Sequence, residues 1–584
     1  LWALSAVVLV AMVGLSVDFA RAQTLRAKMQ NAADGAVLVA ERSSSLTLEE
    51  RQTAARAFFD ASFGNQAMTG PLDFNLAELD DGGHRVTASM TLDMGLTRLI
   101  SNTPWRVAVA SEAMAQASPP IEVVLALDNT GSMNNDMGTL RDSAQELAEF
   151  LLRIDGGSVS VGIVPFVAQV NIGTSNTAWM DTAGANPHHG EMFEDRYLGW
   201  RNNSSNSSTG NCNSTTTYPT TYGGFAVRWV KGPITGISGS TSSRCYAFSP
   251  STVNIYSLYA NLPTNAQWGG CVEARPEPYD ITDDAPVSTT PATMFVPFFS
   301  MDEGGDETDG DNNDNDGNNW ITSTTYDRTN VLGLSGSPTW NAATGVRTLG
   351  VYKYRSGVTV SVANNTIGRG PNRGCPTPIV PLSTDEDTVV DAIQAMQHWY
   401  GGGTNQIEGL AWAWRVISPG APFTQGRPYN DPNDPVRKVI VLFTDGDNTS
   451  LNDYGSTLES EYSALSHRRL WRDFQYATQP TAGLPGLAAT WRRIVTGLDG
   501  SNDDDDMVAY MNTRQGLLCE AIKDAGIEIY TVGFRITDGG TADLLLEACA
   551  TDDGEHYFHA SNATELQTAF RAIGSGIGDL RITH

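Results

Sequence analysis

The stretch I-E-V-V-L-A-L-D-N-T-G-S, from Ile121 to Ser132, is an apolar run that ends in one carboxylate and two hydroxyls. Its first seven residues are rich in Val, Leu and Ile, which is typical of a strand buried on both faces. The next apolar positions are spaced as on one face of a helix: Met137, Leu140, Ala144, Leu147, Leu151 and Ile154. Asp128, Thr130 and Ser132 therefore stand between a strand and a helix, where ligands bind in an open α/β sheet.

Strand and helix patterns continue to alternate along the chain. Further buried strands are predicted at 159–167, 439–443, 527–534 and 556–559, and helices at 389–396, 407–417, 517–525, 542–550 and 563–573. This order predicts an α/β fold with a doubly wound, mostly parallel sheet over residues 118–172 and 376–575. The periodicity is lost between 173 and 375, where we expect a long insertion that contains four of the six cysteines. A second insertion is expected from 448 to about 506.

The amino-terminal residues 1–17 are apolar and uncharged, and the chain does not begin with Met. About 20 apolar residues span a bilayer, so we expect residues 1–20 to be a transmembrane anchor whose start has been lost. Apolar positions continue at helical spacing after this run, which favours one continuous helix: Leu25, Met29, Ala32, Ala36 and Val39. A cleaved signal peptide is the alternative, because Ala20-Arg21-Ala22 resembles a cleavage site. The flanking Lys and Arg leave the orientation open.

Residues 21–117 are expected to form the rest of this helix and a small α+β stalk. Thr47 and Glu50 have the spacing of a capping box, which predicts a helix to about Phe63. Alternation between Val86 and Met94, and a strand at 106–110, predict a small sheet. Nothing in this region suggests chemistry.

Charge and cysteine content restrict the class of protein. The 584 residues carry a formal net charge of −29, from 37 Lys and Arg against 66 Asp and Glu, which argues against nucleic acid as a partner. The six cysteines include no C-x-x-C pair, which favours disulfides in an oxidising compartment. Cys519 and Cys549 lie on helices that flank one strand, so we expect them to pair. The other four allow three pairings, of which Cys271–Cys375 with Cys212–Cys245 is preferred.

Oxygen-bearing side chains stand at three element boundaries far apart in the sequence. Asp128, Thr130 and Ser132 follow the first strand, Thr404 opens a helix after a Gly run, and Asp445 follows the strand at 439–443. These loops can converge on one crevice at the edge of the sheet. Two carboxylates and three hydroxyls without nitrogen or sulfur suit Mg²⁺, with Ca²⁺ and Mn²⁺ as alternatives, and argue against zinc.

This pattern resembles the metal-ion-dependent adhesion site of the von Willebrand factor A domain, D-x-S-x-S followed by a distant Thr and a distant Asp. Here Thr130 replaces the first Ser and keeps its hydroxyl. The resemblance implies that Thr130, Ser132 and Thr404 ligate the ion through their hydroxyls, and that Asp128 and Asp445 do so directly or through water. It also implies an open coordination position that a partner's Asp or Glu carboxylate fills.

A second resemblance concerns the two ends of the chain. Val17 to Ala22 and Ala32 to Ala36 are similar to the amino-terminal segment of TadG-like tight-adherence (Flp) pilus-assembly proteins, and 403–412 and 529–534 also match that class. The resemblance implies a non-enzymatic protein of the bacterial envelope, anchored by one span in the inner membrane, whose A domain lies in the periplasm. Pilus or secretion components are the partners it implies.

Alternatives from other classes remain open. One is a structural scaffold subunit in which metal only stabilises the fold. Another, less favoured, is a metallohydrolase using His188, His189 and Glu191, although no H-E-x-x-H occurs. The acidic run from Asp302 to Asp316 lacks the spacing of an EF-hand, so a solvated loop is favoured there over a Ca²⁺ site. No G-x-S-x-G sequence with a partner His is found.

Overall fold

The computed structural model divides into two compact units, residues 1–118 and 119–583, and each is described by itself. The residues that the structure describes are 2–42, 47–64, 72–79, 83–92, 104–113, 119–154, 159–190, 197–202, 221–222, 225–233, 240–248, 252–300, 302, 318, 320–322, 351, 354–363, 368–400, 403–449, 504–552 and 554–579. The expected second insertion therefore lies almost wholly outside the described residues.

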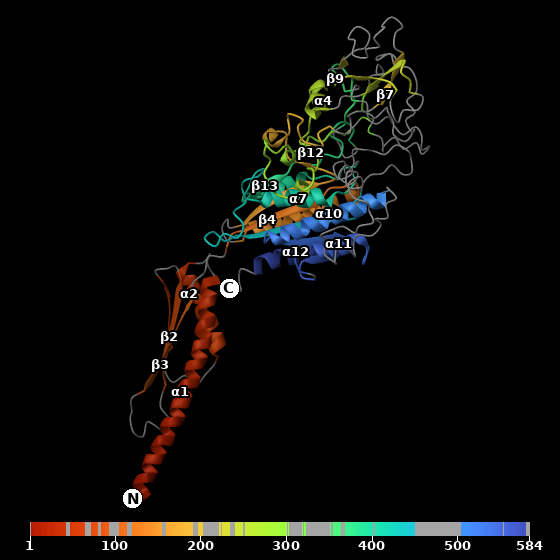
Figure 1. Ribbon diagram of the computed structural model, residues 1–584. Coiled ribbons are helices and arrows are strands. Elements are labelled where there is room, and N and C mark those ends of the chain that lie inside the picture. Colours follow the sequence, from red (N-terminus) through yellow and green to blue (C-terminus); the bar gives the residue numbers. More distant parts are fainter. Residues whose placement is uncertain are drawn as a thin grey trace. The chain divides into compact units, whose positions relative to one another are not determined.

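The first unit consists of two helices and a three-stranded antiparallel sheet (Figure 1). Its elements are α1 (Trp2–Arg42), α2 (Leu48–Phe63), β1 (Asp73–Glu78), β2 (His84–Leu92) and β3 (Trp105–Ala113). Helix α2 begins with the predicted capping box, because the Thr47 hydroxyl accepts a bond from the Glu50 N–H and the Glu50 carboxylate accepts one from the Thr47 N–H. Alternate residues of β2, such as Val86 and Ala88, are buried in a core shared with both helices. Strand β1 is not predicted by the sequence.

Helix α1 is continuous, as the spacing of its apolar residues predicts. Among the described residues, however, no helix has both the length and the apolarity that crossing a bilayer requires. The transmembrane span predicted at residues 1–20 is therefore not confirmed.

The second unit is built on a mostly parallel sheet. Its parallel strands, in spatial order, are β5 (Val159–Phe166), β4 (Ile121–Asp128), β14 (Arg437–Thr444), β15 (Glu528–Phe534) and β16 (Tyr557–Ala560). Three short strands extend one side in antiparallel pairings: β6 (Val170–Asn171), β12 (Cys271–Val272) and β13 (Val380–Ser383). Every residue of β4 is buried, as its apolar run predicts.

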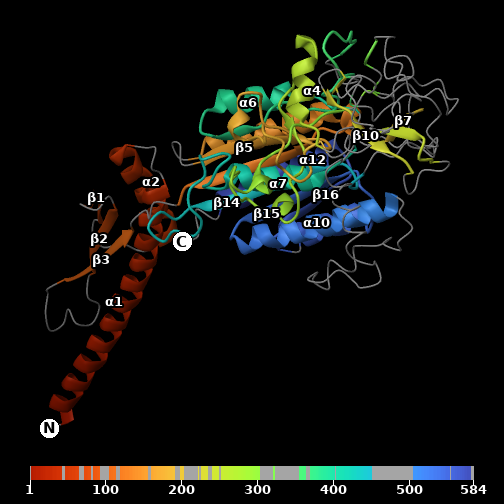
Figure 2. The ribbon, with the colours of Figure 1, turned by 45° about the horizontal axis from the view of Figure 1, so that its top comes forward.

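Helices cover both faces of this sheet, which confirms the predicted α/β fold (Figures 1 and 2). One core contains α3 (Met137–Leu152), α6 (Glu386–Ala395) and α12 (Ala563–Asp579) against Val123 and Leu125. The other contains α7 (Gln406–Ile417), α10 (Asp504–Asp524) and α11 (Thr541–Cys549) against Val124 and Ala126. Because successive residues of a strand point to opposite faces, the two cores divide β4 between them.

The region between 173 and 375 is more ordered than its sequence suggests. It contains α4 (Ile255–Asn261), a sheet of β7 (Tyr197–Asn202), β10 (Arg228–Lys231) and β11 (Arg244–Phe248), and the short pair β8 (Thr221–Tyr222) and β9 (Phe225–Ala226). Isolated aromatic residues such as Trp229, Trp320 and Tyr354 form a separate hydrophobic core there. Sequence periodicity misses such a core because its residues come from irregular segments.

Two disulfides agree with the predicted pairs. Cys519 on α10 is bonded to Cys549 on α11, with 5.3 Å between their Cα atoms, and Cys271 is bonded to Cys375, with 5.8 Å. Both separations are normal for a disulfide. Cys245 is also disulfide-bonded, while Cys212, its predicted partner, lies outside the described residues.

Candidate metal centre

The order of the parallel strands determines where a ligand site can form. Counted along the chain, β4 is the first parallel strand and β5 the second, so the spatial order is 2-1-3-4-5 and reverses between β4 and β14. Ligands bind at such a reversal, beyond the carboxyl ends of the strands. Asp128 is the last residue of β4, and Asp445 follows the last residue of β14. The two predicted carboxylates therefore lie at the switch point of the sheet.

The Asp128 side chain is fully buried and fixed by hydrogen bonds. Its Oδ1 accepts a bond of 2.8 Å from the Thr130 N–H, and its Oδ2 accepts one of 2.7 Å from the Thr444 hydroxyl. Thr444 was not predicted as part of the site. A threonine at the end of an apolar strand is too common for its role to be read from the sequence.

Ser132 connects the first loop to Asp445. The Ser132 hydroxyl donates to Asp445 Oδ1 at 2.7 Å, and the Thr130 and Ser132 hydroxyl oxygens lie 2.9 Å apart. Mg²⁺ holds its ligands at about 2.0–2.1 Å in an octahedron, so neighbouring ligand oxygens are separated by about 2.9 Å. The spacing of these three oxygens is therefore compatible with adjacent positions around a Mg²⁺ ion.

Thr404 is positioned through the loop that follows β14. Its N–H donates to the Thr449 hydroxyl at 2.8 Å, and its carbonyl accepts from the Thr449 N–H at 2.9 Å. Gly403 before it has φ of +73°, and a Cβ there would lie 2.3 Å from the Thr449 carbonyl oxygen. Gly403 is thus needed to bring Thr404 against this loop. Asn448 and Thr449 are further positioning residues that the sequence did not reveal.

Aromatic residues lie beside the first loop. The Trp399 N–H donates to the Asn129 carbonyl at 2.7 Å, and the ring of Tyr400 packs so closely on Gly131 that a Cβ there would lie 2.6 Å from it. The Asn129 side chain is buried, and neither polar atom of its amide has a partner among the described residues. Gly131 is therefore required by packing against Tyr400.

Burial and mutual repulsion affect both carboxylates. Burial raises the pKa of Asp128, against the opposing effect of its hydrogen bonds to Thr130 and Thr444. Burial, together with the nearby charge of Asp128, raises the pKa of Asp445 to about 7. Two acids at close range with raised pKa values form a site that a divalent cation would stabilise in its ionised form. The two carboxylates and the hydroxyls of Thr130 and Ser132 are hard oxygen donors and fit such an ion.

The other residues considered for metal binding serve the fold where they are described. His189 Nδ1 lies 2.8 Å from Asp181, and its Nε2 accepts a bond from the Ile255 N–H, so both ring nitrogens are used. Glu191 lies outside the described residues. Asp302 Oδ1 accepts bonds from the N–H groups of Trp320 and Ile321, and the rest of the acidic run, 303–316, lies outside the described residues. Among the described residues, no group of three or more His, Cys, Asp or Glu is arranged to hold a metal.

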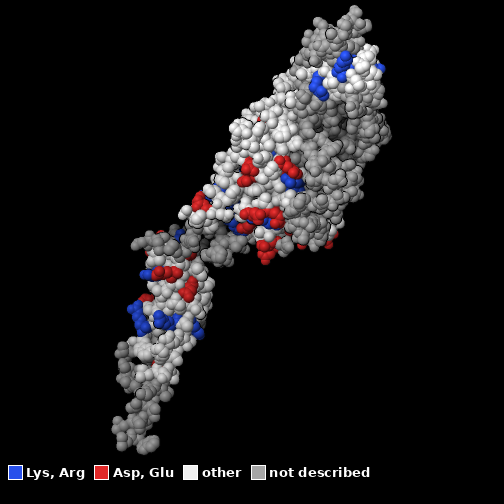
Figure 3. All heavy atoms as spheres, viewed as in Figure 1, with Lys and Arg blue, Asp and Glu red and all other residues white. Residues whose placement is uncertain are grey.

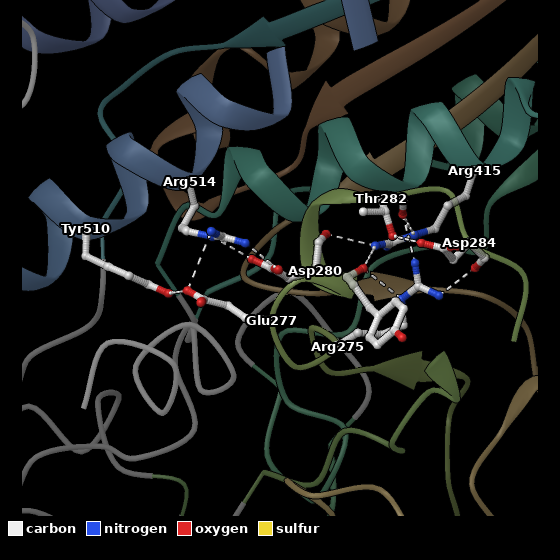
Figure 4. Close-up of polar contacts among 9 residues, drawn as sticks. Arg275, Glu277, Asp280, Thr282, Asp284, Arg415, Tyr510 and Arg514 are labelled. Carbon is white, nitrogen blue, oxygen red and sulfur yellow. Dashed lines mark hydrogen bonds and ion pairs between the residues drawn. The ribbon is translucent and has the colours of Figure 1, made fainter. Parts of the chain in front are cut away.

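Behind the site, α7 and α10 are joined to the insertion by a buried polar network (Figure 4). Arg514 of α10 makes two bonds to the Asp280 carboxylate, of 2.8 and 2.5 Å. Arg415 of α7 donates to the carbonyls of Tyr279, Asp280 and Thr282. Tyr510 of α10 contacts Glu277. The turn at 277–284 is thereby fixed to two helices of the sheet.

A third buried arginine of this network holds the turn itself. Arg275 donates to the carbonyls of Tyr279, Thr282 and Asp284. Burial lowers the pKa of Arg275 and of Arg415, and raises the pKa of Glu408 on α7 to about 7. The sequence gives no sign of this network, because Arg415 and Arg514 lie more than 100 positions from their partners and Arg275 binds backbone carbonyls.

The charged surface shows no single basic area on the face drawn in Figure 3. Among the described residues, acidic and basic side chains are dispersed in small groups over this face. Neutralising a nucleic-acid backbone requires a continuous basic surface. Binding of a divalent cation at the sheet edge does not require a basic surface.

Comparisons with known proteins concern different parts of the chain. Residues 1–55 match the family described as Putative Flp pilus-assembly TadE/G-like. No curated protein matches the sequence. The solved structures that resemble the chain include the vWF domain of the type V pili tip protein Mfa5 from Porphyromonas gingivalis, at 10% identity and a TM-score of 0.30, covering 80% of this chain and 98% of that one.

Two pilus adhesins are also similar. SpaC from Lactobacillus rhamnosus GG has 10% identity and a TM-score of 0.28, over 88% of this chain and 35% of that one. RrgA from Streptococcus pneumoniae has 10% identity and a TM-score of 0.28, over 87% of this chain and 48% of that one. The amino-terminal segment of the chain, residues 1–55, is thus a match to the TadE/G-like family of Flp pilus assembly, as the motifs between Val17 and Ala36 predict.

Proposed function

We propose that this chain is a pilus-assembly or adhesion protein of the bacterial envelope that binds a partner's carboxylate through a divalent cation. The preferred ion is Mg²⁺, and it would be held by Asp128, Thr130, Ser132, Thr404 and Asp445. The role is one of binding, without catalysis. The observation that carries the proposal is the run of oxygens Thr130–Ser132–Asp445 at the switch point of the sheet, with separations of 2.9 and 2.7 Å.

The number of donors explains how a partner would be captured. Five protein oxygens leave one of the six octahedral positions of Mg²⁺ open for a further oxygen ligand. A partner's Asp or Glu side chain is a suitable ligand for a hard cation. Pilus or secretion components are the partners that the match of residues 1–55 favours.

The same match and the disulfides support an envelope location. Two described pairs, Cys271–Cys375 and Cys519–Cys549, are bonded. Disulfides persist in oxidising compartments such as the periplasm. We infer that residues 119–583 act outside the cytoplasm and that the apolar amino-terminal segment anchors the chain in the inner membrane.

The first prediction concerns removal of one carboxylate. Asp128→Ala is expected to abolish stabilisation by Mg²⁺, because it removes a ligand and the group that fixes the Thr130 loop. A site saturated at 100 times its dissociation constant stabilises the fold by about 2.7 kcal/mol, and that increment would be lost. Thermal unfolding with Mg²⁺ and with EDTA measures it. Capture of the partner from envelope extract, with and without EDTA, gives the functional readout.

Asp391→Ala on α6 is the matched control, because Asp391 is an exposed aspartate of the same unit. It should retain the full response to Mg²⁺. If Asp128→Ala kept both the Mg²⁺ response and metal-dependent capture, the metal-mediated mechanism would be wrong. Pilus assembly that survives Asp128→Ala but fails when α1 is altered would instead indicate a structural scaffold.

The second prediction concerns pH. Asp445 has a pKa raised to about 7 in the metal-free fold, from an ordinary value of 3.8, so Mg²⁺ must displace a proton below pH 7. The apparent affinity for Mg²⁺ should therefore fall by up to about tenfold per pH unit below 7. Without Mg²⁺, in EDTA, the free energy of unfolding should depend on pH in the opposite direction. The raised pKa of Asp445 stabilises the fold at low pH, and this contribution is lost as the pH rises through about 7.

Thermal unfolding at pH 5, 6, 7 and 8, with and without Mg²⁺, measures both effects. Asp445→Asn should flatten the pH dependence that this residue causes and remove the Mg²⁺ response. An Mg²⁺-induced shift in melting temperature that is equal at pH 5 and pH 8 would contradict the prediction.

A further inference from the structure

Buried side-chain amides connect the loop that carries Asp445 to helix α10. Asn448, three residues after Asp445, donates through its Nδ2 to Asn512 Oδ1 at 2.9 Å and to Gln515 Oε1 at 2.6 Å. Both acceptors lie on α10, three positions apart and therefore on the same side of the helix. The Asn448 Oδ1 accepts a bond of 3.0 Å from the Gln406 N–H at the start of α7. All four amide side chains are buried, so the position of the loop depends on both helices.

The same network holds the backbone beside two of the candidate ligands. Gln515 Nε2 donates to Gln406 Oε1 at 2.9 Å, and Gln406 Nε2 donates to the Gly446 carbonyl, also at 2.9 Å. Gly446 directly follows Asp445, and Gln406 stands two positions after Thr404. Removal of one partner would leave buried amide groups without a hydrogen bond, which is costly. The loop, the start of α7 and this part of α10 are therefore expected to move together.

The insertion is bonded to the same stretch of α10. Arg514 contacts the Asp280 carboxylate and Tyr510 contacts Glu277, as Figure 4 shows. Because an α-helix has 3.6 residues per turn, the two amide side chains of α10 leave from the side opposite to Tyr510 and Arg514. Helix α10 thus lies between the insertion and the Asp445 loop, with hydrogen bonds to each.

We propose that Asn512 and Gln515 are positioning residues of the metal centre, and that through them the docking of the insertion on α10 sets the affinity for Mg²⁺. The inference rests on the proposed function, because it concerns the same ion. A helix bonded to both regions allows the state of one to bias the other. Coupling between two sites is reciprocal, so bound Mg²⁺ should also hold the turn at 277–284 more firmly.

The test measures Mg²⁺ binding to the full chain by calorimetric titration, at a temperature at which circular dichroism shows every variant to be folded. Gln515→Met keeps the length of the side chain and removes its hydrogen bonds. Its dissociation constant for Mg²⁺ should rise about tenfold, within the usual range of coupling between sites. Asp280→Asn weakens the contact with Arg514 from the side of the insertion and should change the constant in the same direction.

Thr513→Val is the matched control. Thr513 is buried on the same helix, and its hydroxyl donates to the Ala509 carbonyl within that helix. The substitution keeps the shape of the side chain and does not touch the amide network, so the dissociation constant for Mg²⁺ should remain that of the wild type.

Hydrogen exchange of the turn at 277–284 provides a readout that a general loss of stability would not change. Mg²⁺ should slow exchange there by about the same factor as the coupling in the wild type and in Thr513→Val, and much less in Gln515→Met. A substitution that only destabilised the fold would speed exchange but leave the effect of Mg²⁺ in place.

The outcomes separate this inference from the metal centre itself. Equal Mg²⁺ affinity in the wild type and Gln515→Met, or an equal effect of Mg²⁺ on exchange in both, would overturn the positioning role and leave the metal centre standing. The same loss of affinity in Thr513→Val would also overturn it, because the cause would then be general destabilisation. A wild type that binds no Mg²⁺, or Mg²⁺ binding that survives Asp128→Ala, would overturn the proposed function and this inference together.

Discussion

Asp280→Ala is expected to lower the free energy of unfolding of residues 119–583 by about 3–5 kcal/mol, the usual effect of removing one partner from a buried ion pair. Asp280 is fully buried, and its carboxylate is bonded to the buried guanidinium of Arg514 through both oxygens. Alanine would leave Glu277, at 3.5 Å, as the one remaining acid paired with this guanidinium in the described part of the chain. Urea unfolding followed by tryptophan fluorescence measures the loss.

Two further variants identify the cause. Asp280→Asn keeps the size of the side chain and removes its charge, so it should retain part of the stability. Glu277→Gln changes a partly exposed carboxylate in the same turn and should cost no more than about 1 kcal/mol. If Asp280→Ala were as mild as Glu277→Gln, the network would not be holding the insertion on α7 and α10.

The second large effect is expected in residues 1–118. Phe59→Ala should destabilise this unit by about 3–5 kcal/mol, through lost burial and the cavity left behind. Phe59 is fully buried, and its ring lies 5.6 Å from that of Phe63 and 5.3 Å from that of Phe74, between centroids. In a unit of about 100 residues this corresponds to a fall in melting temperature of more than about 10 °C. Calorimetry of the whole chain would follow it as a separate transition.

Phe58 provides a control on the same helix. Its side chain is 41% exposed, so Phe58→Ala removes an equal number of atoms at a much smaller cost, about 1 kcal/mol. The transition of residues 119–583 should not move in either variant. Equal shifts for Phe58→Ala and Phe59→Ala would show that the core of the first unit is not centred on this helix face.

The sheet and its helices were predictable because burial leaves a pattern in the sequence. The apolar strands β4, β5, β14 and β15 and the helices around them lie within a few residues of their predicted bounds, except α10, which begins at Asp504 and not near Leu517. Strand β1 was missed, since the sequence Asp73–Glu78 has one buried residue and little alternation. The polar pair Glu122 and Lys438 was also missed, although these residues contact each other between neighbouring strands.

The candidate site was predictable only in part, because some of its residues leave no distinctive pattern in the sequence. Asp128, Thr130, Ser132 and Asp445 are short side chains at strand ends, and the structure joins them by direct hydrogen bonds or by charge. Thr444 supports Asp128 and Thr449 supports Thr404, but hydroxyl residues at strand ends and in loops are frequent and carry no distinctive spacing. A cavity of about 380 Å³ lined by Asn171, Trp268 and Trp399 could not be predicted, because its lining comes from segments far apart in the sequence.

The insertion leaves and rejoins the sheet at neighbouring positions, since the Ile379 N–H donates to the Asn171 carbonyl at 2.8 Å. A module attached in this way can be lengthened, shortened or exchanged during evolution without altering the strand order. The insertion makes buried contacts with Arg415 and Arg514. A module that replaces it must therefore supply new hydrogen-bond partners for these two arginines. Relatives with shorter insertions should therefore carry apolar residues at both positions.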